Sequence, residues 1–410
     1  MNYTITIKEG KEKQLLRHHP WVFSGAIKKV EPQFNIASWA DVYTEKGVFI
    51  AKGWYDEKSH IVLHLLSWNE KEKMGEAFVK RLVREAILRR RNFFSKDSTT
   101  NAFRLIHGEA DFLPGFAVDA YASNVRIILS SRFAAAFLQS AVEEIDSLIH
   151  PNLIIATSDK DYASSEGLSE RNRYFIGAEE KKMADDAIGP VTILENGIYY
   201  EIPGTKGQKS GFYVDQRDNR VIAEEYAQGK TCLDVCSYTG AFTLHLLKGG
   251  AKSVKAIDSS ESALRHLLYQ THLNEEKGTI EKKSREKVEI LSGDCFELLR
   301  AEEGGKYDLI VLDPPKLAKT KGALENAMKA YKDLNRVAME KIKNGGILIT
   351  FSCSGALSRE DFRTVLSWSA KDARVEAEIL RTLSQGEDHP IRLSFPESEY
   401  LKGYVLRIIK

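Results

Sequence analysis

The second half of the sequence alternates regularly between strand-like and helix-like segments, and this alternation constrains the fold more than any other feature. Short runs rich in Val, Ile and Leu are each followed by a longer segment with helical periodicity. Because parallel strands need a crossover connection, usually a helix, the pattern predicts an α/β fold: a doubly wound, mostly parallel sheet with helices on both faces. The predicted strands are 231–235, 253–258, 287–291, 307–312, 347–352, 374–380 and 403–409; the predicted helices are 241–250, 260–276, 295–303, 324–343 and one from residue 359.

The first half of the sequence predicts two smaller domains. Residues 1–72 contain short β-like runs and predict a small, mostly β domain, with strands at 3–7, 21–27, 47–55 and 61–68. Residues 73–188 predict a central α+β domain that begins with a long helix at 75–94 and contains a second helix at 133–149. The Asn196-Gly197 pair predicts a hairpin over residues 191–202, which leads into a last domain at 189–410.

Composition narrows the classes of protein that this chain can belong to. Of 410 residues, 43% are hydrophobic and 29% are charged, as in an ordinary water-soluble protein. No apolar run approaches the roughly 20 residues of a membrane span, and the first ten residues lack a signal-peptide pattern, so we expect a cytoplasmic protein. The net charge of +1 gives no global case for nucleic-acid binding. The four cysteines predict reduced thiols and no metal site, and the apolar first domain leaves homodimerisation open.

Acidic residues stand at the ends of four successive predicted strands. They are Asp234, Asp258, Asp294 and Asp313. Any one of them, Asp294 above all, is also explained as the cap of the following helix. Together they predict a ligand crevice, because open α/β sheets bind ligands outside the carboxyl ends of their strands.

Two further features of these strand ends predict what the crevice does. The turn at 236–240 lacks the G-x-G-x-x-G pattern, which disfavours a pyrophosphate ligand, and Asp258 is suited to a ribose diol. The stretch LIVLDPPK ends a buried strand in an acid and two prolines, whereas FSCS ends another strand in Cys353. We hypothesise that the crevice holds S-adenosylmethionine (SAM) and that Cys353 attacks a nucleobase.

Several motifs resemble those of one known family. Residues 207–410 resemble a class I SAM-dependent methyltransferase, and GQKSGFYVDQRDNR, DVCSYTGAF, LDPPK, FSCS and EDHP…PESEYLKGY resemble the RlmI-like family of ribosomal RNA cytosine-C5 methyltransferases. HPWVFSGAI is similar to the entry of that family's RNA-binding PUA domain, and GEADFLPGFAVDAY to its central domain. The resemblance covers nearly the whole chain in order, so it implies a SAM-dependent enzyme that acts on large-subunit ribosomal RNA.

The resemblance also implies roles for individual residues. The expected cofactor-binding residues are Gln208, Lys209, Ser210, Phe212, Asp234, Cys236, Ser237, Tyr238, Gly240, Asp258, Ser259, Asp294, Cys295 and Asp313. The expected RNA contacts are Trp21, Arg89, Arg90, Arg91, Lys316 and Lys319, although a basic helix end such as 89–91 is equally well explained as a solvated face.

The expected chemistry needs a cysteine. Cytosine C5 is a poor nucleophile, and attack on C6 by the Cys353 thiolate would turn C5 into an enamine-like carbon able to accept a methyl group. Asp313 would hydrogen-bond with cytosine N3, or donate to it, as charge develops. Lys316 stands where two-cysteine RNA methyltransferases carry a second cysteine, so the resemblance assigns no group to remove the C5 proton.

Two other functions fit the same sequence. Motifs of the DPP type also serve amino-group chemistry, so methylation of a base nitrogen or of uracil is one alternative. The other is an RNA-binding assembly factor that has kept the fold and lost turnover.

Overall fold

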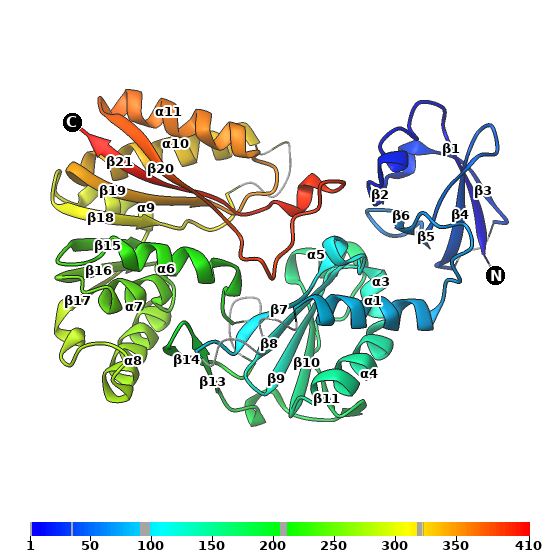
Figure 1. Cartoon of the computed structure of the whole chain (residues 1–410), viewed down its shortest axis with the longest axis horizontal. Coiled ribbons are helices and arrows are strands. Elements are labelled where there is room, and N and C mark those ends of the chain that lie inside the picture. The colour runs from blue at the N-terminus through cyan, green and yellow to red at the C-terminus, as the bar shows by residue number, and fades with distance from the viewer. Residues whose placement is uncertain (1, 34–35, 91–98, 206–210, 318–321, 323) are drawn as a thin grey trace. The chain divides into compact units, whose positions relative to one another are not determined.

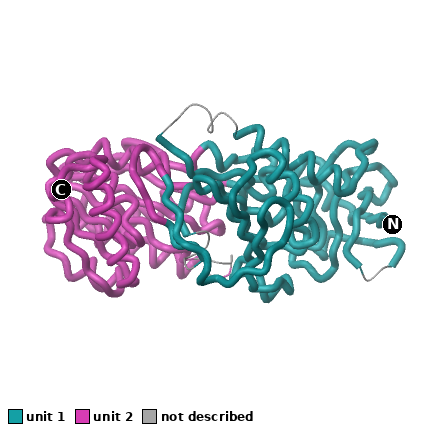
Figure 2. The backbone as a smooth tube through the Cα atoms, turned by 90° about the horizontal axis from the view of Figure 1, so that it is seen from below, with its two compact units in different colours: residues 1–193, 202–214, 387–398 teal, residues 194–201, 215–386, 399–410 magenta. Residues whose placement is uncertain are grey.

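The computed structural model describes residues 2–33, 36–90, 99–205, 211–317, 322 and 324–410. Figure 1 shows the elements of the chain, and Figure 2 shows its two compact units. The first unit comprises residues 1–193, 202–214 and 387–398, and the second comprises residues 194–201, 215–386 and 399–410. The first unit thus includes one segment, 387–398, from the C-terminal part of the chain.

The N-terminal part of the first unit is a β-sheet with strand order β2-β6-β5-β4-β1-β3. Residues alternate between buried and solvent-facing along β1, as a half-buried strand requires: Tyr3, Ile5 and Ile7 are fully buried. The predicted strand 21–27 is shorter than expected, because residues 24–26 form a 3₁₀ turn after β2. The strands are β1 (Tyr3–Ile7), β2 (Trp21–Val22), β3 (Ile27–Glu31), β4 (Ser38–Thr44), β5 (Phe49–Tyr55) and β6 (Leu63–Ser67).

A second sheet of the first unit has the order β12-β11-β10-β9-β8-β7 and packs against helices, as an α+β domain does. The helix predicted over 133–149 is broken at Phe137, whose ring packs on Trp54 with ring centroids 5.0 Å apart. The elements are α1 (Glu76–Arg89), β7 (Ala102–His107), β8 (Phe116–Tyr121), β9 (Asn124–Leu129), α3 (Arg132–Ala136), α4 (Leu138–Ile149), β10 (Leu153–Ser158), α5 (Lys160–Glu166), β11 (Arg173–Ile176) and β12 (Glu179–Lys181).

The second unit is built on a sheet with strand order β17-β16-β15-β18-β19-β21-β20. The strands from β17 to β19 are parallel, and β21 runs antiparallel between β19 and β20, which confirms the predicted doubly wound, mostly parallel sheet. The strands are β15 (Thr231–Val235), β16 (Ser253–Asp258), β17 (Val288–Ser292), β18 (Tyr307–Leu312), β19 (Ile342–Ser352), β20 (Glu376–Ser384) and β21 (Lys402–Ile409).

Helices cover both faces of this sheet (Figure 1). One buried cluster joins the sheet to Leu299, Tyr331 and Phe362, which come from three different helices. A separate cluster joins Leu264 and Leu267 to Ala256 of β16. The helices are α6 (Arg217–Glu225), α7 (Ala241–Lys248), α8 (Glu261–Lys277), α9 (Cys295–Ala301), α10 (Leu324–Lys341) and α11 (Arg359–Ala373).

The predicted hairpin is also present. β13 (Val191–Glu195) and β14 (Ile198–Ile202) flank Asn196 and Gly197, whose φ angles of 49° and 80° are those that a tight hairpin turn requires.

Candidate active site

The carboxyl ends of the parallel strands lie side by side at one edge of the second unit's sheet. Val235 of β15 pairs with Leu312 of β18, which in turn pairs with Thr350 of β19. Because these strands are parallel and in register, the residues that follow them, including Asp313 and Cys353, come to the same edge.

Asp234, the second-to-last residue of β15, is a buried carboxylate with one oxygen that accepts no hydrogen bond from the described residues. Its Oδ2 atom accepts a hydrogen bond of 2.7 Å from the Thr243 hydroxyl, whereas Oδ1 has no partner among the described residues. Burial raises the pKa of Asp234 to about 7, with a smaller contribution from the charge of Asp258, and the hydrogen bonds from Thr243 oppose this rise. A buried acceptor of this kind is typical of a site that a polar ligand completes.

The turn between β15 and α7 has an unusual backbone. Cys236 and Tyr238 have φ angles of 62° and 50°, which side-chain-bearing residues rarely adopt, and Gly240 has a φ of 83°. A Cβ atom on Gly240 would lie 2.2 Å from the Leu267 side chain, so only glycine fits there. The buried Ser237 hydroxyl has no hydrogen-bond partner among the described residues.

Asp258 fixes the shape of this turn. Its two carboxylate oxygens accept hydrogen bonds of 2.8 Å, one from the Tyr238 N–H and one from the Ser260 N–H. A carboxylate has about four lone-pair positions, so these contacts leave acceptor capacity for a ribose diol. The neighbouring Ser259 is exposed at the same strand end.

Asp294 and Cys295 lie at the start of α9. The Oδ1 atom of Asp294 accepts hydrogen bonds from the N–H groups of Phe296 and Glu297, at 2.9 and 3.0 Å. This exposed residue therefore caps the helix, which is the alternative role that the sequence offered for it. Cys295 is buried, and its thiol forms a hydrogen bond with the thiol of Cys236. This hydrogen bond and, to a lesser extent, burial raise the pKa of Cys236 well above its ordinary value.

Asp313 directly follows β18 and is held by a chain of side chains. The Gln216 amide donates a hydrogen bond of 3.0 Å to Asp313, and the Asn219 amide donates one of 2.6 Å to Gln216. Asp215, whose Oδ2 accepts a 2.6 Å hydrogen bond from the Tyr400 hydroxyl, adds a nearby negative charge. Burial and the charge of Asp215 raise the pKa of Asp313 to about 7, against the effect of Gln216, so this carboxyl can carry a proton near neutral pH.

All four of these supporting residues lie in motifs that the sequence analysis singled out, but none of them was assigned a role there. Asp215, Gln216 and Asn219 lie within the motif GQKSGFYVDQRDNR, and Tyr400 lies within PESEYLKGY. Their contacts with each other were not visible in the sequence because 97 residues separate Gln216 from Asp313.

Cys353 follows β19 and is partly exposed. Its thiol lies 4.0 Å from the carbonyl oxygen of Pro314, the residue after Asp313. The residues on either side, Ser352 and Ser354, are buried, and the Ser354 hydroxyl lies 3.0 Å from the Tyr331 hydroxyl. The structure therefore brings Cys353 and the Asp313-Pro314 turn together.

The remaining cofactor candidates do not belong to the second unit. Phe212 is buried in the first unit, where its carbonyl oxygen accepts a hydrogen bond of 3.1 Å from the Tyr121 hydroxyl. Gln208, Lys209 and Ser210 lie outside the described residues, as do Arg91 and Lys319 among the RNA candidates.

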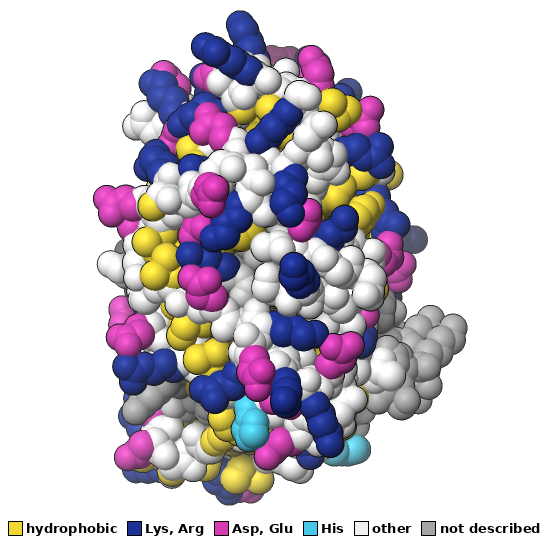
Figure 3. Space-filling model, turned by 90° about the vertical axis from the view of Figure 1, so that its left-hand side faces the viewer, with side chains coloured by type: hydrophobic (Ala, Val, Ile, Leu, Met, Phe, Trp, Pro, Cys, Tyr) yellow, Lys and Arg dark blue, Asp and Glu magenta, His cyan; other side chains and the backbone are white. Residues whose placement is uncertain are grey.

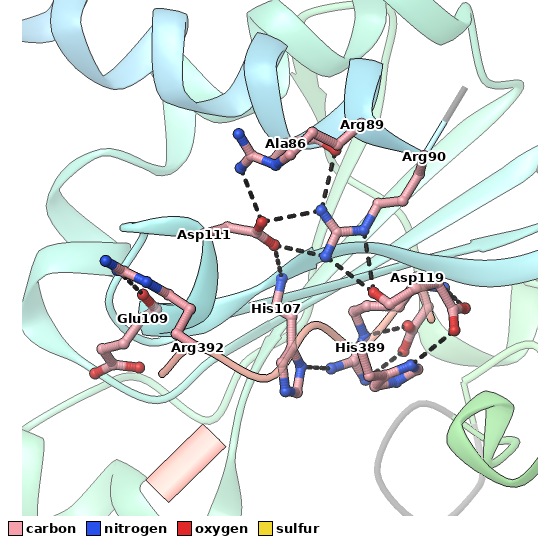
Figure 4. Close-up of polar contacts among 11 residues, drawn as sticks. Ala86, Arg89, Arg90, His107, Glu109, Asp111, Asp119, His389 and Arg392 are labelled. Carbon is pink, nitrogen blue, oxygen red and sulfur yellow. Dashed lines mark hydrogen bonds and ion pairs between the residues drawn. The ribbon is translucent and has the colours of Figure 1, made fainter. Parts of the chain in front are cut away.

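Acids in the first unit that could be imagined as a catalytic set form ion pairs instead (Figure 4). Asp111 pairs with Arg90 at 2.7 Å and with Arg89 at 2.9 Å. Asp119 pairs with Arg104 at 2.6 Å. Asp111 lies in the turn after β7 and Asp119 lies within β8, and both acids are engaged in ion pairs that hold the fold together.

Two of the expected RNA contacts are engaged within the first unit. Arg90 is only 3% exposed, and its guanidinium also donates to the main-chain oxygen of Asp388, so burial leaves it no surface for a phosphate. The Trp21 indole donates a hydrogen bond of 3.0 Å to Glu109, and its ring packs on Phe395 with ring centroids 4.7 Å apart. Arg89 remains about half exposed beside Asp111.

The described surface shows no single-sign patch on the face drawn in Figure 3, where Lys and Arg alternate with Asp and Glu. Lys316, on the exposed side of the Asp313-Pro314 turn, is a cation next to the site itself. Within the described ranges no group of three or more His, Cys, Asp or Glu side chains is placed to hold a metal ion. None of the described helices has the length and apolar character needed to cross a bilayer.

Two family models match this chain. Residues 5–68 match a PUA-like domain, and residues 104–387 match an S-adenosylmethionine-dependent methyltransferase. Among curated proteins, the ribosomal RNA large subunit methyltransferase I of Tolumonas auensis is 37% identical, and that of Pseudoalteromonas translucida is 35% identical. Each of these alignments covers 100% of both chains.

Solved structures share the fold. A protein crystallised in complex with S-adenosylhomocysteine superposes with a TM-score of 0.81 at 20% identity, over 98% of this chain and 99% of the other. A protein from Streptococcus mutans assigned to the SAM-dependent methyltransferases superposes with a TM-score of 0.79, also at 20% identity and with the same coverage.

Proposed function

The chain belongs to the family of SAM-dependent methyltransferases that includes the ribosomal RNA large subunit methyltransferases I, and from that premise we propose that it forms 5-methylcytosine in large-subunit ribosomal RNA through a covalent adduct with Cys353. The full-length similarity to these relatives supports the RNA substrate. The positions of Cys353 and Asp313 support cytosine as the target base and a covalent adduct as the route to its methylation.

The residues at the strand ends fit a bound SAM. Asp234 and Ser237 each offer a buried polar atom that has no partner among the described residues, and the strained turn at 236–240 brings its backbone close to the same edge. Asp258 offers acceptor capacity for the ribose hydroxyls, whereas Cys236 and Cys295 shape the wall. When bound, SAM supplies an electrophilic methyl group and leaves as S-adenosylhomocysteine.

The observation that carries the proposal is the meeting of Cys353 with the Asp313-Pro314 turn. In the proposed step, the Cys353 thiolate forms a bond to C6 of cytosine, and the π electrons of the C5–C6 bond move toward N3. Asp313 donates its proton to N3, which its raised pKa of about 7 makes feasible near neutral pH. The base is left with electron density at C5, the carbon that is methylated.

The second half of the reaction restores the enzyme. The C5 proton passes to solvent, the electron pair of the C5–H bond forms the C5–C6 double bond, the C6–S bond breaks, and Cys353 leaves as a thiolate. N3 returns its proton to the Asp313 carboxylate. Gln216 and Asn219 keep Asp313 in one orientation during both transfers, because the hydrogen bonds of 3.0 and 2.6 Å form a continuous chain to it.

The N-terminal PUA-like domain is the proposed RNA-holding module. Structured RNA is recognised mostly by shape and phosphate contacts. Outside the PUA-like domain, Lys316 and Arg89 present exposed cations for such phosphate contacts. Arg90 and Trp21 would instead maintain the first unit, because both are engaged within it. Since the proposed substrate is ribosomal RNA, we place the enzyme in the cytoplasm.

Replacing Cys353 tests the proposal. The Cys353→Ala variant should lose methylation of ribosomal RNA but still bind SAM by calorimetry, because the thiol is needed only for the bond to C6. Cys232→Ala is the matched control: Cys232 is fully buried within β15, so its thiol should be dispensable for turnover.

A trapping experiment separates this proposal from methylation of a base nitrogen. RNA carrying 5-fluorocytosine should form a protein–RNA adduct that resists denaturation, because fluorine cannot leave C5 as a proton does. Full activity of Cys353→Ala, or no adduct with wild-type protein, would contradict the covalent route. Absence of SAM binding would favour the assembly-factor alternative.

A further inference from the structure

A buried lysine lies beside the proposed nucleophile. Lys402 begins β21, is only 1% exposed, and pairs in register with Ser352 of β19. Its ammonium donates a hydrogen bond of 2.9 Å to the main-chain oxygen of Ser354. The ammonium is therefore held at the short segment that contains Cys353, at the end of the neighbouring strand.

No described carboxylate forms an ion pair with Lys402. The charge of Glu399 influences Lys402, but Glu399 already pairs with Arg359 at 2.7 Å. Lys316 is a further cation in the surroundings and is exposed. A buried charge that lacks a counter-charge is costly, so the position of Lys402 favours a negative charge nearby.

Cys353 is the group that can supply that counter-charge. Burial lowers the pKa of Lys402 to about 8, and the thiolate form of Cys353 is the largest influence acting in the opposite direction. Two other titratable groups lie near the thiol. Burial raises the pKa of Tyr331 to about 12, so its hydroxyl stays neutral. Asp313 belongs to the turn that the thiol approaches, and burial raises its pKa to about 7, so it adds a negative charge to the site only above neutral pH. Lys402 is thus a buried cation, held at the residue next to Cys353, whose charge interacts with that of the thiolate.

We propose that Lys402 is a positioning residue that maintains Cys353 as a thiolate before it meets the base. The inference rests on the proposed role of Cys353 as nucleophile and names the group that prepares it. The thiol loses its proton to solvent, the ammonium keeps its own, and the two opposite charges stabilise each other. Nucleophilic cysteines beside lysine typically show a lowered pKa for this reason.

The pH dependence of Cys353 alkylation tests this directly. Full-length protein is treated with iodoacetamide across a pH series, and the rate at Cys353 is followed by peptide mass spectrometry, without RNA. In wild-type protein the midpoint of the rate should lie below the ordinary thiol value of about 8.5. In Lys402→Met it should rise by about one unit or more, so that alkylation at pH 7 slows about tenfold or more.

Two variants separate charge from structure. Lys402→Arg keeps a cation and should keep a low midpoint. Lys255 of β16 is another largely buried lysine of the same unit and pairs with Glu302 at 2.6 Å. Lys255→Met should leave the midpoint of Cys353 alkylation unchanged. SAM binding by calorimetry confirms that each variant is folded.

The outcomes are distinct. A low wild-type midpoint that rises in Lys402→Met but not in Lys402→Arg supports the proposal. A wild-type midpoint at or above about 8.5, an unchanged midpoint in Lys402→Met, or an equal rise in Lys402→Arg overturns it. If Lys402→Met does not fold, the proposal is judged on the other two proteins, whose midpoints should both lie below about 8.5. The alkylation experiment needs no RNA, so its result does not depend on the proposed catalytic role of Cys353. Methylation that persists in Cys353→Ala would refute that role but would not contradict the pairing of the Cys353 thiolate with Lys402.

Discussion

Replacing Asp313 with asparagine should slow methylation and at the same time stabilise the chain at pH 8. The carboxyl of Asp313 has a pKa of about 7, against an ordinary value of 3.8, because of burial and the charge of Asp215. Above pH 3.8 the unfolded chain ionises this group freely, whereas the folded chain resists ionisation until about pH 7. The stability that the neutral carboxyl contributes is therefore present at low pH and lost as pH rises through that window.

The size of the effect follows from the two pKa values. Linkage gives a destabilisation of about 4 kcal/mol at pH 8 and about 1.7 kcal/mol at pH 5, relative to a group that cannot ionise. Asp313 is partly exposed, so solvent screening reduces these figures, and we expect roughly half of them. Asparagine is nearly isosteric and its carbonyl oxygen can still accept the hydrogen bond from Gln216, so Asp313→Asn should be more stable than wild type by about 2 kcal/mol at pH 8 and less at pH 5.

The assay is urea denaturation followed by circular dichroism at both pH values. Asp308→Asn is the matched control, because Asp308 lies on β18, the strand that Asp313 directly follows. Burial acts to raise the pKa of Asp308, but the Thr231 N–H and Lys343, each at 2.9 Å, outweigh it and lower the pKa. Asp308→Asn should therefore lose stability at pH 8, with an effect of the opposite sign.

Activity provides the second measurement on the same variant. An amide can donate a hydrogen bond to cytosine N3 but cannot transfer a proton, so the methylation rate of Asp313→Asn should fall about 10²–10⁴-fold. The wild-type rate should also decline above pH 7 as Asp313 ionises. A variant that is less stable than wild type at pH 8, or one that methylates RNA at the wild-type rate, would refute the assignment of Asp313 as a protonated acid.

Three other changes should have measurable effects. Gly240→Ala should weaken SAM binding in calorimetry and lower stability by at least about 1–2 kcal/mol, because of its positive φ and the 2.2 Å approach of its Cβ to Leu267; unchanged affinity would argue against this turn as part of the cofactor site. His64 is buried with its pKa lowered to about 4, so the folded chain cannot take up its proton, and acidification from pH 7 to pH 5 should cost roughly 2 kcal/mol of stability that a His64→Gln variant retains. Arg90→Met leaves the Asp111 carboxylate buried with less compensation, and should lower the urea midpoint by the equivalent of about 3–5 kcal/mol; a loss below about 1 kcal/mol would show that the pair is dispensable.

The sequence by itself determined the architecture of the second unit. Residues 231–235, 253–258 and 307–312 are strands with the same bounds that periodicity predicts, because apolar runs of this length between helical segments can bury both faces only inside a parallel sheet. The positions of Asp234, Asp258, Asp313 and Cys353 at or next to strand ends followed from the same reading, since parallel strands present all their carboxyl ends at one edge.

Local sequence was less reliable where tertiary packing competes with propensity. The segment 133–149 has helical periodicity throughout, but it breaks at Phe137, whose ring packs against aromatic residues of the N-terminal sheet. Arg90 belongs to a basic run that reads as a solvated or phosphate-binding face, yet it is buried against Asp111, 21 residues further along the chain. In both cases a contact distant in sequence decides the outcome.

Only the tertiary structure decided the chemical state of the site. The sequence places an acid after β18 and a cysteine after β19, but a pKa depends on burial and on charges within a few ångströms. Asp215, Gln216 and Lys402 act on these two groups across 98, 97 and 49 residues of chain, respectively, and no periodicity in the sequence encodes such closeness. The sequence identified which side chains could react, and the fold determined which of them carry protons and which carry charge.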